Sequence, residues 1–182
     1  MSTHYSKLVE RKIKSKKIYK GVIGFNEDTV RLINGKTSTR AYTVHPGASA
    51  ILPIADDGSI IFVEQYRYPI KTVTLELPAG KLKPRQTPLE CAKAELAEET
   101  GYRAAKMTKL LDFCPSVAFS DEVLHIFIAT GLTEGKTNPD DDEFVNTKKL
   151  SFEKALELVK KGKIRDSKTL IALLYYKTFC LK

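Results

Sequence analysis

The sequence predicts an α+β fold in which helices flank a mixed β-sheet. Three observations predict it. Short β-rich runs separated by turn residues fill the N-terminal part of the chain and resume after its middle. One well-capped helical segment lies between these groups of strands, and two further helical segments close the chain. The sequence contains no internal repeat and no low-complexity segment.

The clearest signal near the N-terminus is a β-hairpin. β-Rich residues at 29–33 and 36–44 flank Asn34-Gly35, a pair that favours a tight turn in which both residues take positive φ. We also expect a first strand over 16–24. We therefore divide the chain into an N-terminal unit, residues 1–46, with a basic arm and a β-hairpin, and a main domain, residues 47–182.

The net charge of +8 is concentrated in the basic arm. Residues 1–20 hold seven lysine or arginine residues and one acid, Glu10. Such an arm is typical of nucleic-acid binding or of a solvated terminus. Because the remaining chain is nearly neutral, we expect a solvated terminus and no nucleic-acid partner.

Strands of the main domain follow in order. The first two, at 48–54 and 60–66, are joined by the turn residues Asp56-Asp57-Gly58. Other apolar runs predict strands at 73–77, 107–113, 123–130 and 144–149.

The best-defined element is a helix over 89–100. Thr87 is a good N-cap, Pro88 occupies the first helical position, and Glu90 completes a capping box. Gly101 supplies a left-handed stop. The apolar residues that we expect to face a core lie on one arc: Leu89, Ala92 and Leu96.

Three carboxylates, Glu95, Glu98 and Glu99, occupy the neighbouring arc of this helix. Like charges at this spacing destabilise a helix by about 0.2–0.5 kcal/mol per pair. A divalent cation that prefers oxygen ligands would compensate the repulsion. Such acidic runs also occur on solvated helix faces, so the helix by itself leaves both interpretations open.

Two helices are expected at the C-terminus. Ser151 caps the first, which runs to about Lys160 and ends at Gly162. Asp166 or Ser167 opens the second. Its residues at core spacing are Ile171, Leu174 and Tyr175.

Composition restricts the class of protein. The chain has 182 residues, 42% of them hydrophobic and 29% charged, which is ordinary for a soluble globular domain. It has no apolar run long enough to span a membrane and no secretion signal. Its three cysteines lack metal-ligand spacing and fit reduced thiols, so we expect a cytoplasmic protein.

The stretch from Gly80 to Tyr102 resembles the Nudix box, G-x5-E-x7-R-E-U-x-E-E-x-G-U, where U is aliphatic or aromatic. Gln86 replaces the first Glu of that pattern, and Ala94 replaces its Arg. The resemblance implies a Nudix-type α/β/α sandwich with a mixed sheet for residues 47–182. The positions that match in register are Gly80, Glu95, Leu96, Glu98, Glu99, Gly101 and Tyr102.

Segments outside the box are similar to the ADP-ribose pyrophosphatase branch of that superfamily. The branch implies hydrolysis of the diphosphate bond of ADP-ribose or a related nucleoside diphosphate sugar, giving a nucleoside monophosphate and a sugar phosphate. It also implies a homodimer with exchanged N-terminal strands, which would make residues 1–46 a dimerisation unit. The segments are HPGA at 45–48, EQYRYP at 64–69, LELPAGKL at 75–82, PSVAFSDE at 115–122 and DDDEFV at 140–145.

The resemblance assigns metal and acid–base roles. Mg²⁺ or Mn²⁺ would be held by Glu95, Glu98 and Glu99, together with the backbone carbonyl of Ala79. Glu99 would therefore also be a catalytic residue. The catalytic base would come from the acidic loop that begins at Asp140. Glu143 and Asp142 are the leading candidates for this base, and Asp141 is a further one.

Substrate contacts are implied at four further positions. Arg67 would bind the diphosphate bidentately, and Glu76 would hold a ribose hydroxyl or order the metal shell. Arg40 would reach the substrate from the exchanged hairpin. Tyr19 would stack on the base, although an aromatic residue near a strand also fits a core position.

Two other functions remain open from the sequence. One is a non-catalytic nucleotide-sugar-binding Nudix protein, because the box is degenerate at Gln86 and Ala94. The other is an RNA-end pyrophosphohydrolase that uses the basic arm. The segment at 115–122 argues against this function, because it resembles a marker of ADP-ribose-type substrates.

Overall fold

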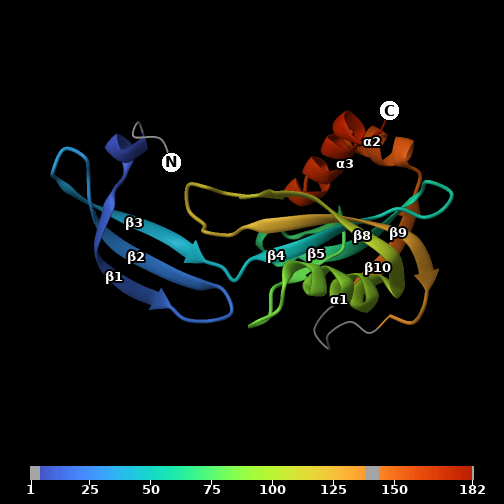
Figure 1. Ribbon diagram of the computed structural model, residues 1–182, viewed down its shortest axis with the longest axis horizontal. Coiled ribbons are helices and arrows are strands. Elements are labelled where there is room, and N and C mark those ends of the chain that lie inside the picture. The colour runs from blue at the N-terminus through green and yellow to red at the C-terminus, as the bar shows by residue number, and fades with distance from the viewer. Residues whose placement is uncertain (1–4, 138–143, 182) are drawn as a thin grey trace. The chain divides into compact units, whose positions relative to one another are not determined.

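The computed structural model describes residues 5–137 and 144–181. The chain divides into two compact units (Figure 1). The N-terminal unit runs to Pro46 and takes in Cys114–Val123, and the main unit comprises Gly47–Phe113 and the chain from Leu124 onward. No helix in the described ranges is long and apolar enough to cross a bilayer.

The N-terminal unit is an antiparallel sheet of three strands in the order β1-β2-β3. The expected hairpin is present, but the first strand begins before the predicted 16–24 and takes up most of the basic arm. Its lysine-rich, fully exposed sequence suits an edge strand, where lysine discourages further pairing. The bounds are η1, a 3-10 helix, Tyr5–Leu8; β1 Arg11–Tyr19; β2 Gly24–Arg31; and β3 Thr37–Val44.

The turn of this hairpin differs from the expected one. Gly35 has a φ of 83°, whereas Asn34 does not have a positive φ. The N–H of Gly35 donates to the carbonyl of Leu32 at 3.0 Å, and the N–H of Leu32 donates to the carbonyl of Lys36 at 2.8 Å. The connection is therefore a β-turn followed by one left-handed glycine, which is the next most common way to close a hairpin.

The segment Cys114–Val123 is joined to strand β3. The N–H of Thr43 donates to the carbonyl of Phe119 at 2.8 Å, and the N–H of His45 donates to Asp121 Oδ1 at 2.7 Å. The PSVAFSDE segment therefore belongs to the N-terminal unit, although it lies inside the range 47–182 in sequence.

The main unit contains a four-stranded sheet, β7-β4-β9-β8, and a three-stranded sheet, β10-β5-β6. Strands β4 and β9 are parallel and the other pairs are antiparallel, so the sheet is mixed as expected. The bounds are β4 Ala48–Pro53, β5 Ile60–Arg67, β6 Thr72–Glu76, β7 Ala79–Lys81, β8 Tyr102–Phe113, β9 Leu124–Glu134 and β10 Val145–Leu150, with a 3-10 turn η2 at Tyr68–Ile70.

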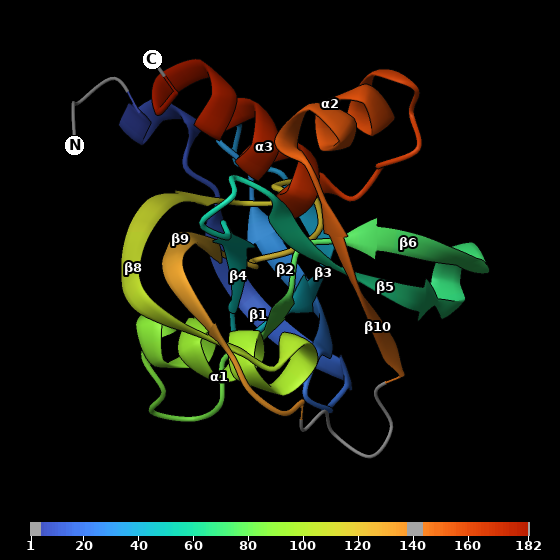
Figure 2. The same ribbon diagram turned by 90° about the vertical axis from the view of Figure 1, so that its right-hand side faces the viewer.

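Helices cover both sides of the strands of the main unit (Figure 2). Helix α1, Pro88–Thr100, packs against β4 and β9 through Ala92 and Leu96. Helices α2, Phe152–Lys160, and α3, Ser167–Phe179, pack on the opposite side in the larger of two apolar clusters. The predicted α/β/α sandwich is confirmed.

The predicted core face of α1 is wrong at one position, because Leu89 is 38% exposed. In the first turn, polar contacts replace apolar ones. Ser49 Oγ donates to the carbonyl of Pro88 at 2.8 Å, and Cys91 Sγ lies 3.4 Å from the carbonyl of Gly80. The inward arc of the helix therefore runs through Cys91 and Ala92 instead of Leu89.

The predicted core face of α3 is also largely wrong. Ile171 packs against the core, but Leu174 and Tyr175 are 47% and 37% exposed. The expectation failed because two residues that look like surface residues in the sequence are inside. The buried residues of the helix are Lys168, Thr169, Ala172 and Leu173.

Candidate active site

The capping box expected at the start of α1 is formed. Thr87 Oγ1 accepts a hydrogen bond from the N–H of Glu90 at 3.3 Å, and Glu90 Oε2 accepts one from the N–H of Thr87 at 2.8 Å. Gly101, with a φ of 76°, ends the helix. These two ends fix the turns of the helix that carry Glu95 and Glu99.

Glu99 is nearly buried and is held by the sheet. It is 3% exposed, and its Oε2 accepts a hydrogen bond from the N–H of Ala79 at 2.9 Å. Ala79 is the first residue of β7 and pairs with Ala50 of β4. Strand β7, whose Ala79 carbonyl is one of the predicted metal ligands, therefore also orients the Glu99 carboxylate.

Glu95 lies directly over Gly80. A Cβ added to Gly80 would stand 1.9 Å from Glu95 Oε1 and 2.0 Å from Glu95 Cδ, well inside van der Waals contact. Any side chain at this position would displace the carboxylate. The glycine that opens the Nudix-like pattern therefore makes room for a carboxylate that is itself 8% exposed.

The donor set suits a hard cation without forming a complete cage. Among the residues that the structure describes, no group of three or more His, Cys, Asp or Glu side chains is arranged to hold a metal ion. Mg²⁺ is usually held by one or two carboxylates, while water and substrate phosphates complete its shell. Glu95, Glu99 and the Ala79 carbonyl fit that mode, and Glu98 is a further, half-buried carboxylate on the same helix.

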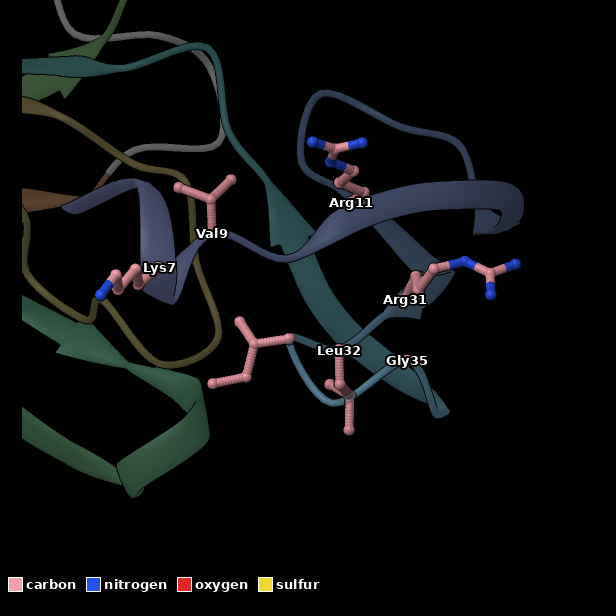
Figure 3. A pocket seen from close by; sticks show the side chains of 7 residues that line it. Lys7, Val9, Arg11, Arg31, Leu32 and Gly35 are labelled. Atoms are coloured by element: carbon pink, nitrogen blue, oxygen red, sulfur yellow. The ribbon is translucent and has the colours of Figure 1, made fainter. Parts of the chain in front are cut away.

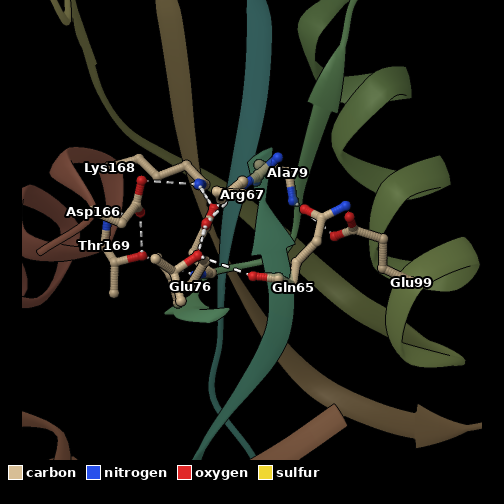
Figure 4. A network of polar contacts seen from close by, with 10 residues as sticks. Gln65, Arg67, Glu76, Ala79, Glu99, Asp166, Lys168 and Thr169 are labelled. Carbon is tan, nitrogen blue, oxygen red and sulfur yellow. Dashed lines mark hydrogen bonds and ion pairs between the residues drawn. The ribbon is translucent and has the colours of Figure 1, made fainter. Parts of the chain in front are cut away.

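Arg67 and Glu76, predicted separately as substrate contacts, are bonded to each other (Figure 4). Arg67 Nε donates to Glu76 Oε1 at 2.7 Å, and Arg67 Nη2 donates to Oε2 at 2.6 Å. The Arg67 side chain is 41% exposed, whereas that of Glu76 is 3% exposed. Glu76 therefore orients the arginine from the buried side. It is not available to a ribose hydroxyl while this bidentate pair is formed.

The pKa values of this pair follow from burial and contact. Burial raises the pKa of Glu76, but hydrogen bonds from Arg67 and the charge of Lys168 outweigh it and lower the pKa to about 2. The hydrogen bond to Glu76 raises the pKa of Arg67, and the charges of Asp166 and Glu99 raise it further. Both side chains are ionised at neutral pH.

Sequence reasoning missed the residues of α3 that complete this network. Lys168 Nζ donates to Glu76 Oε2 and, at 3.1 Å, to Asp166 Oδ1. Thr169 Oγ1 accepts from the N–H of Leu77 at 2.8 Å. The available signal was the polar run Asp166-Ser-Lys-Thr at the start of an apolar helix, which was interpreted only as a cap. Asp166, not Ser167, is the N-cap.

A hollow of about 310 Å³ lies over the network. Its polar lining comes from three elements, and Pro69 and Ile70 add an apolar wall. The polar lining residues are Arg67, Thr74, Glu76, Arg165, Asp166 and Lys168.

Two predicted substrate contacts, Arg40 and Tyr19, belong to the N-terminal unit. The Arg40 guanidinium forms an ion pair with Glu10 and donates to the carbonyl of Thr39 at 2.9 Å. Tyr19 is 64% exposed, so the alternative of a core position is wrong for this aromatic ring. It lines a hollow of about 300 Å³ together with Lys17, Lys20 and His45.

The larger hollow of the N-terminal unit, of about 690 Å³, is lined by three cations and by apolar residues that include Val9 and Leu32. Lys7, Arg11 and Arg31 extend in three different directions (Figure 3). The three cations therefore do not converge on one point in this hollow.

The acidic loop predicted to supply the base, Asp140 to Glu143, lies outside the described residues. The two positions that depart from the Nudix-like pattern are described. Gln86 Oε1 accepts from the N–H of Lys83 at 3.0 Å, across a turn in which Arg85 has a φ of 66°. Gln86 therefore stabilises the turn that leads into the helix, and Ala94 is half-buried.

Comparison with protein families identifies the class. Residues 43–173 match the model of the NUDIX domain. The match covers most of the chain, so this chain belongs to the NUDIX family, as the pattern from Gly80 to Tyr102 predicted.

Particular relatives agree with this family. The chain is 43% identical over 169 residues to the methanol dehydrogenase activator of Bacillus methanolicus, with 91% of each chain covered. It is 43% identical over 171 residues to the ADP-ribose pyrophosphatase of Bacillus subtilis (strain 168), with 92% of each covered. A solved structure of an ADP compounds hydrolase superimposes with a TM-score of 0.81, covers 92% of each chain and is 19% identical, which supports the fold.

Proposed function

We propose that this chain is a metal-dependent pyrophosphohydrolase that cleaves the diphosphate bond of ADP-ribose or a related nucleoside diphosphate sugar. The products are a nucleoside monophosphate and a sugar phosphate. The observation that carries the proposal is a pair of nearly buried carboxylates on α1. Glu95 lies over Gly80, and Glu99 accepts a hydrogen bond from the N–H of Ala79.

Each residue of the site has a defined task in this reaction. Glu95 and Glu99, with the Ala79 carbonyl and with Glu98, would hold Mg²⁺ or Mn²⁺. When bound there, such an ion would neutralise charge on the diphosphate and help to activate water for attack. Arg67 binds a phosphate oxygen through the Nη1 edge that Glu76 does not occupy, and Glu76 fixes the plane of the guanidinium.

The remaining assignments rest on the family resemblance. One acid among Asp141, Asp142 and Glu143 takes the proton from the attacking water. Tyr19 and Arg40 contact the nucleoside from the N-terminal strands of a partner copy in a homodimer. We place the enzyme in the cytoplasm, which the three free thiols of Cys91, Cys114 and Cys180 support.

A panel of nucleoside diphosphate sugars tests the proposal. Wild-type protein and the Glu99→Gln variant are assayed with ADP-ribose, ADP-glucose and GDP-mannose at low and high Mg²⁺. We expect turnover of at least one sugar by wild type and loss of most activity in Glu99→Gln with the fold retained, because an amide does not replace an anionic ligand. Binding without turnover would instead support a non-catalytic nucleotide-sugar-binding protein. Activity confined to RNA ends would support an RNA-end pyrophosphohydrolase.

A second candidate function comes from the relative named a methanol dehydrogenase activator, which is as similar as the pyrophosphatase. In this alternative the same hydrolytic site serves to activate a dehydrogenase. Adding wild-type protein and Glu99→Gln to a purified methanol dehydrogenase tests it. A rise in dehydrogenase rate with wild type alone supports this role, and no rise with either protein rejects it.

A further inference from the structure

Glu76 has a full set of hydrogen-bond partners. Its Oε1 accepts from Arg67 Nε and from Thr74 Oγ1, and its Oε2 accepts from Arg67 Nη2 and from Lys168 Nζ. A carboxylate offers about four acceptor positions. Arg67 and Lys168 therefore share one anion, and Arg67 reaches it from strand β5 while Lys168 reaches it from helix α3 (Figure 4).

Lys168 is an unusual lysine because its side chain is only 8% exposed. Lysine is almost never fully buried unless it is paired, since removing an ammonium group from water is costly. Here Glu76 and Asp166 both contact its Nζ atom. Asp166 is in turn fixed as the N-cap of α3, where it accepts from the N–H of Thr169 at 3.0 Å. The ammonium group is thus held in place by the first turn of the helix.

The cluster balances its charges. Arg67 and Lys168 are the cations, and Glu76 and Asp166 are the anions, which gives a net charge of zero. Without the lysine charge, the cluster would carry a net negative charge, and Arg67 would be the principal counterion of a buried carboxylate. A guanidinium in that position is drawn toward Glu76, and an approaching diphosphate meets an excess of negative charge.

We propose that Lys168 is a positioning residue for Arg67: by giving Glu76 a second cation, it leaves the guanidinium free to bind an anionic diphosphate over the hollow. This inference rests on the proposed function. Lys168 acts through Arg67, because its own side chain is buried whereas that of Arg67 is 41% exposed.

The test measures KM and kcat on the nucleotide sugar that wild type hydrolyses, and it measures binding of inorganic pyrophosphate by calorimetry. Losing a hydrogen bond to a charged group weakens binding by roughly ten- to hundredfold. We expect Lys168→Met to raise KM and the Kd for pyrophosphate by roughly tenfold or more with kcat within about twofold, the pattern of lost ground-state binding. Lys168→Arg restores the cation and should recover most of the affinity.

Two further variants separate positioning from a structural role. Thr169→Val removes the hydrogen bonds of the Thr169 hydroxyl with the N–H of Leu77 and with Asp166 Oδ2, while the backbone bond from the N–H of Thr169 to Asp166 and all four charges of the cluster remain. It should therefore lower Tm while KM stays within about twofold. In an Arg67→Gln background, Lys168→Met should have little further effect, because the lysine has no arginine left to position. Lys168→Gln takes the place of Lys168→Met if the latter fails to fold.

Three results would overturn the inference: unchanged pyrophosphate affinity in Lys168→Met, no recovery in Lys168→Arg, or additive losses from Lys168→Met and Arg67→Gln. Additive losses would mean that Lys168 touches the ligand itself. If wild type binds pyrophosphate but hydrolyses no nucleotide sugar, the proposed function fails, and the binding measurements still decide the role of Lys168.

Discussion

At the scale of single residues, the carboxylates of the site differ by what surrounds them. Glu99 accepts a backbone N–H, Glu95 lies over a glycine, and Glu76 is enclosed by two cations. The first two are the carboxylates that we propose as donors for a cation. The third is neutralised internally, so it positions other groups and does not bind a metal ion.

Gly80→Ala tests the close approach of Glu95. The new Cβ would stand 1.9 Å from Glu95 Oε1, and the end of that side chain moves more easily than the sheet. We expect kcat/KM to fall roughly 10–100-fold, as is typical when a ligand's support is lost, with Tm nearly unchanged. Steady-state kinetics measures kcat/KM, and thermal unfolding measures Tm. If Gly80→Ala had the kcat/KM of wild type, the position of the Glu95 carboxylate over Gly80 would not matter for activity.

Acid stability tests the ionisation of Glu76. Its folded pKa of about 2 lies below the ordinary 4.5, so the stabilisation is present above pH 4.5 and is lost as the pH falls toward 2. The shift corresponds to on the order of 3 kcal/mol. We expect Glu76→Gln to be less stable than wild type at pH 6, by urea unfolding, with the difference shrinking toward pH 2.

Glu157→Gln is the matched control for this measurement. The pKa of Glu157 is also lowered to about 2, by Lys154 and Lys161, but its side chain is 41% exposed, whereas that of Glu76 is 3% exposed. Salt and water screen such pairs, so this variant should track wild type over the whole range. A constant difference between wild type and Glu76→Gln from pH 6 to pH 2 would contradict the assignment.

At the scale of elements, helix α3 shows both what the sequence predicts and where it misleads. Its position and its cap follow from Asp166 and the apolar run. Its buried face does not, because Lys168 and Thr169 are inside, where Glu76 and the N–H of Leu77 satisfy them. Periodicity alone treats a lysine as a surface residue, and its partner lies 92 positions earlier in the chain.

A pair of neighbouring leucines tests the observed face of α3. Leu173 is fully buried and Leu174 is 47% exposed. Truncating a buried leucine costs about 2–5 kcal/mol, whereas surface changes cost about 0.5 kcal/mol or less. We therefore expect Leu173→Ala to be strongly destabilised and Leu174→Ala to be close to wild type in chemical denaturation. Equal losses would place both residues in the core.

At the scale of the whole molecule, the sequence predicted the sandwich, most of its strands and the helix that carries the carboxylates, but not strand β7. Those features depend on local signals, such as the Thr87–Glu90 capping box and Gly101. The Arg67–Glu76–Lys168 network joins two neighbouring strands, β5 and β6, to a helix residue that lies 92 positions after Glu76, so no local pattern marks it. The turn at Gly35 was mistaken because Asn-Gly pairs fit more than one kind of hairpin turn.

The N-terminal unit leads to a prediction about assembly. The unit has a sheet of three strands, and several of its large apolar side chains are exposed: Leu8 in η1, Ile13 in β1 and Ile33 in the β2–β3 turn, at 70%, 50% and 67%. Such a small sheet with exposed apolar residues is typical of an interaction surface. We expect light scattering at micromolar concentration to give about twice the chain mass of 20.4 kDa. A monomeric mass would refute the homodimer, and Ile13→Asp with Ile33→Asp should shift the mass toward the monomer.

The central claim is that the carboxylates of α1 support metal-dependent cleavage of a nucleoside diphosphate sugar. The most direct measurement is product analysis after chelator-treated protein is incubated with ADP-ribose and increasing Mg²⁺. We expect no products without the ion and equal amounts of AMP and ribose 5-phosphate once it is restored, with Glu99→Gln nearly inactive at the same Mg²⁺. Products that form equally well without a divalent ion, or cleavage elsewhere than in the diphosphate, would contradict this claim.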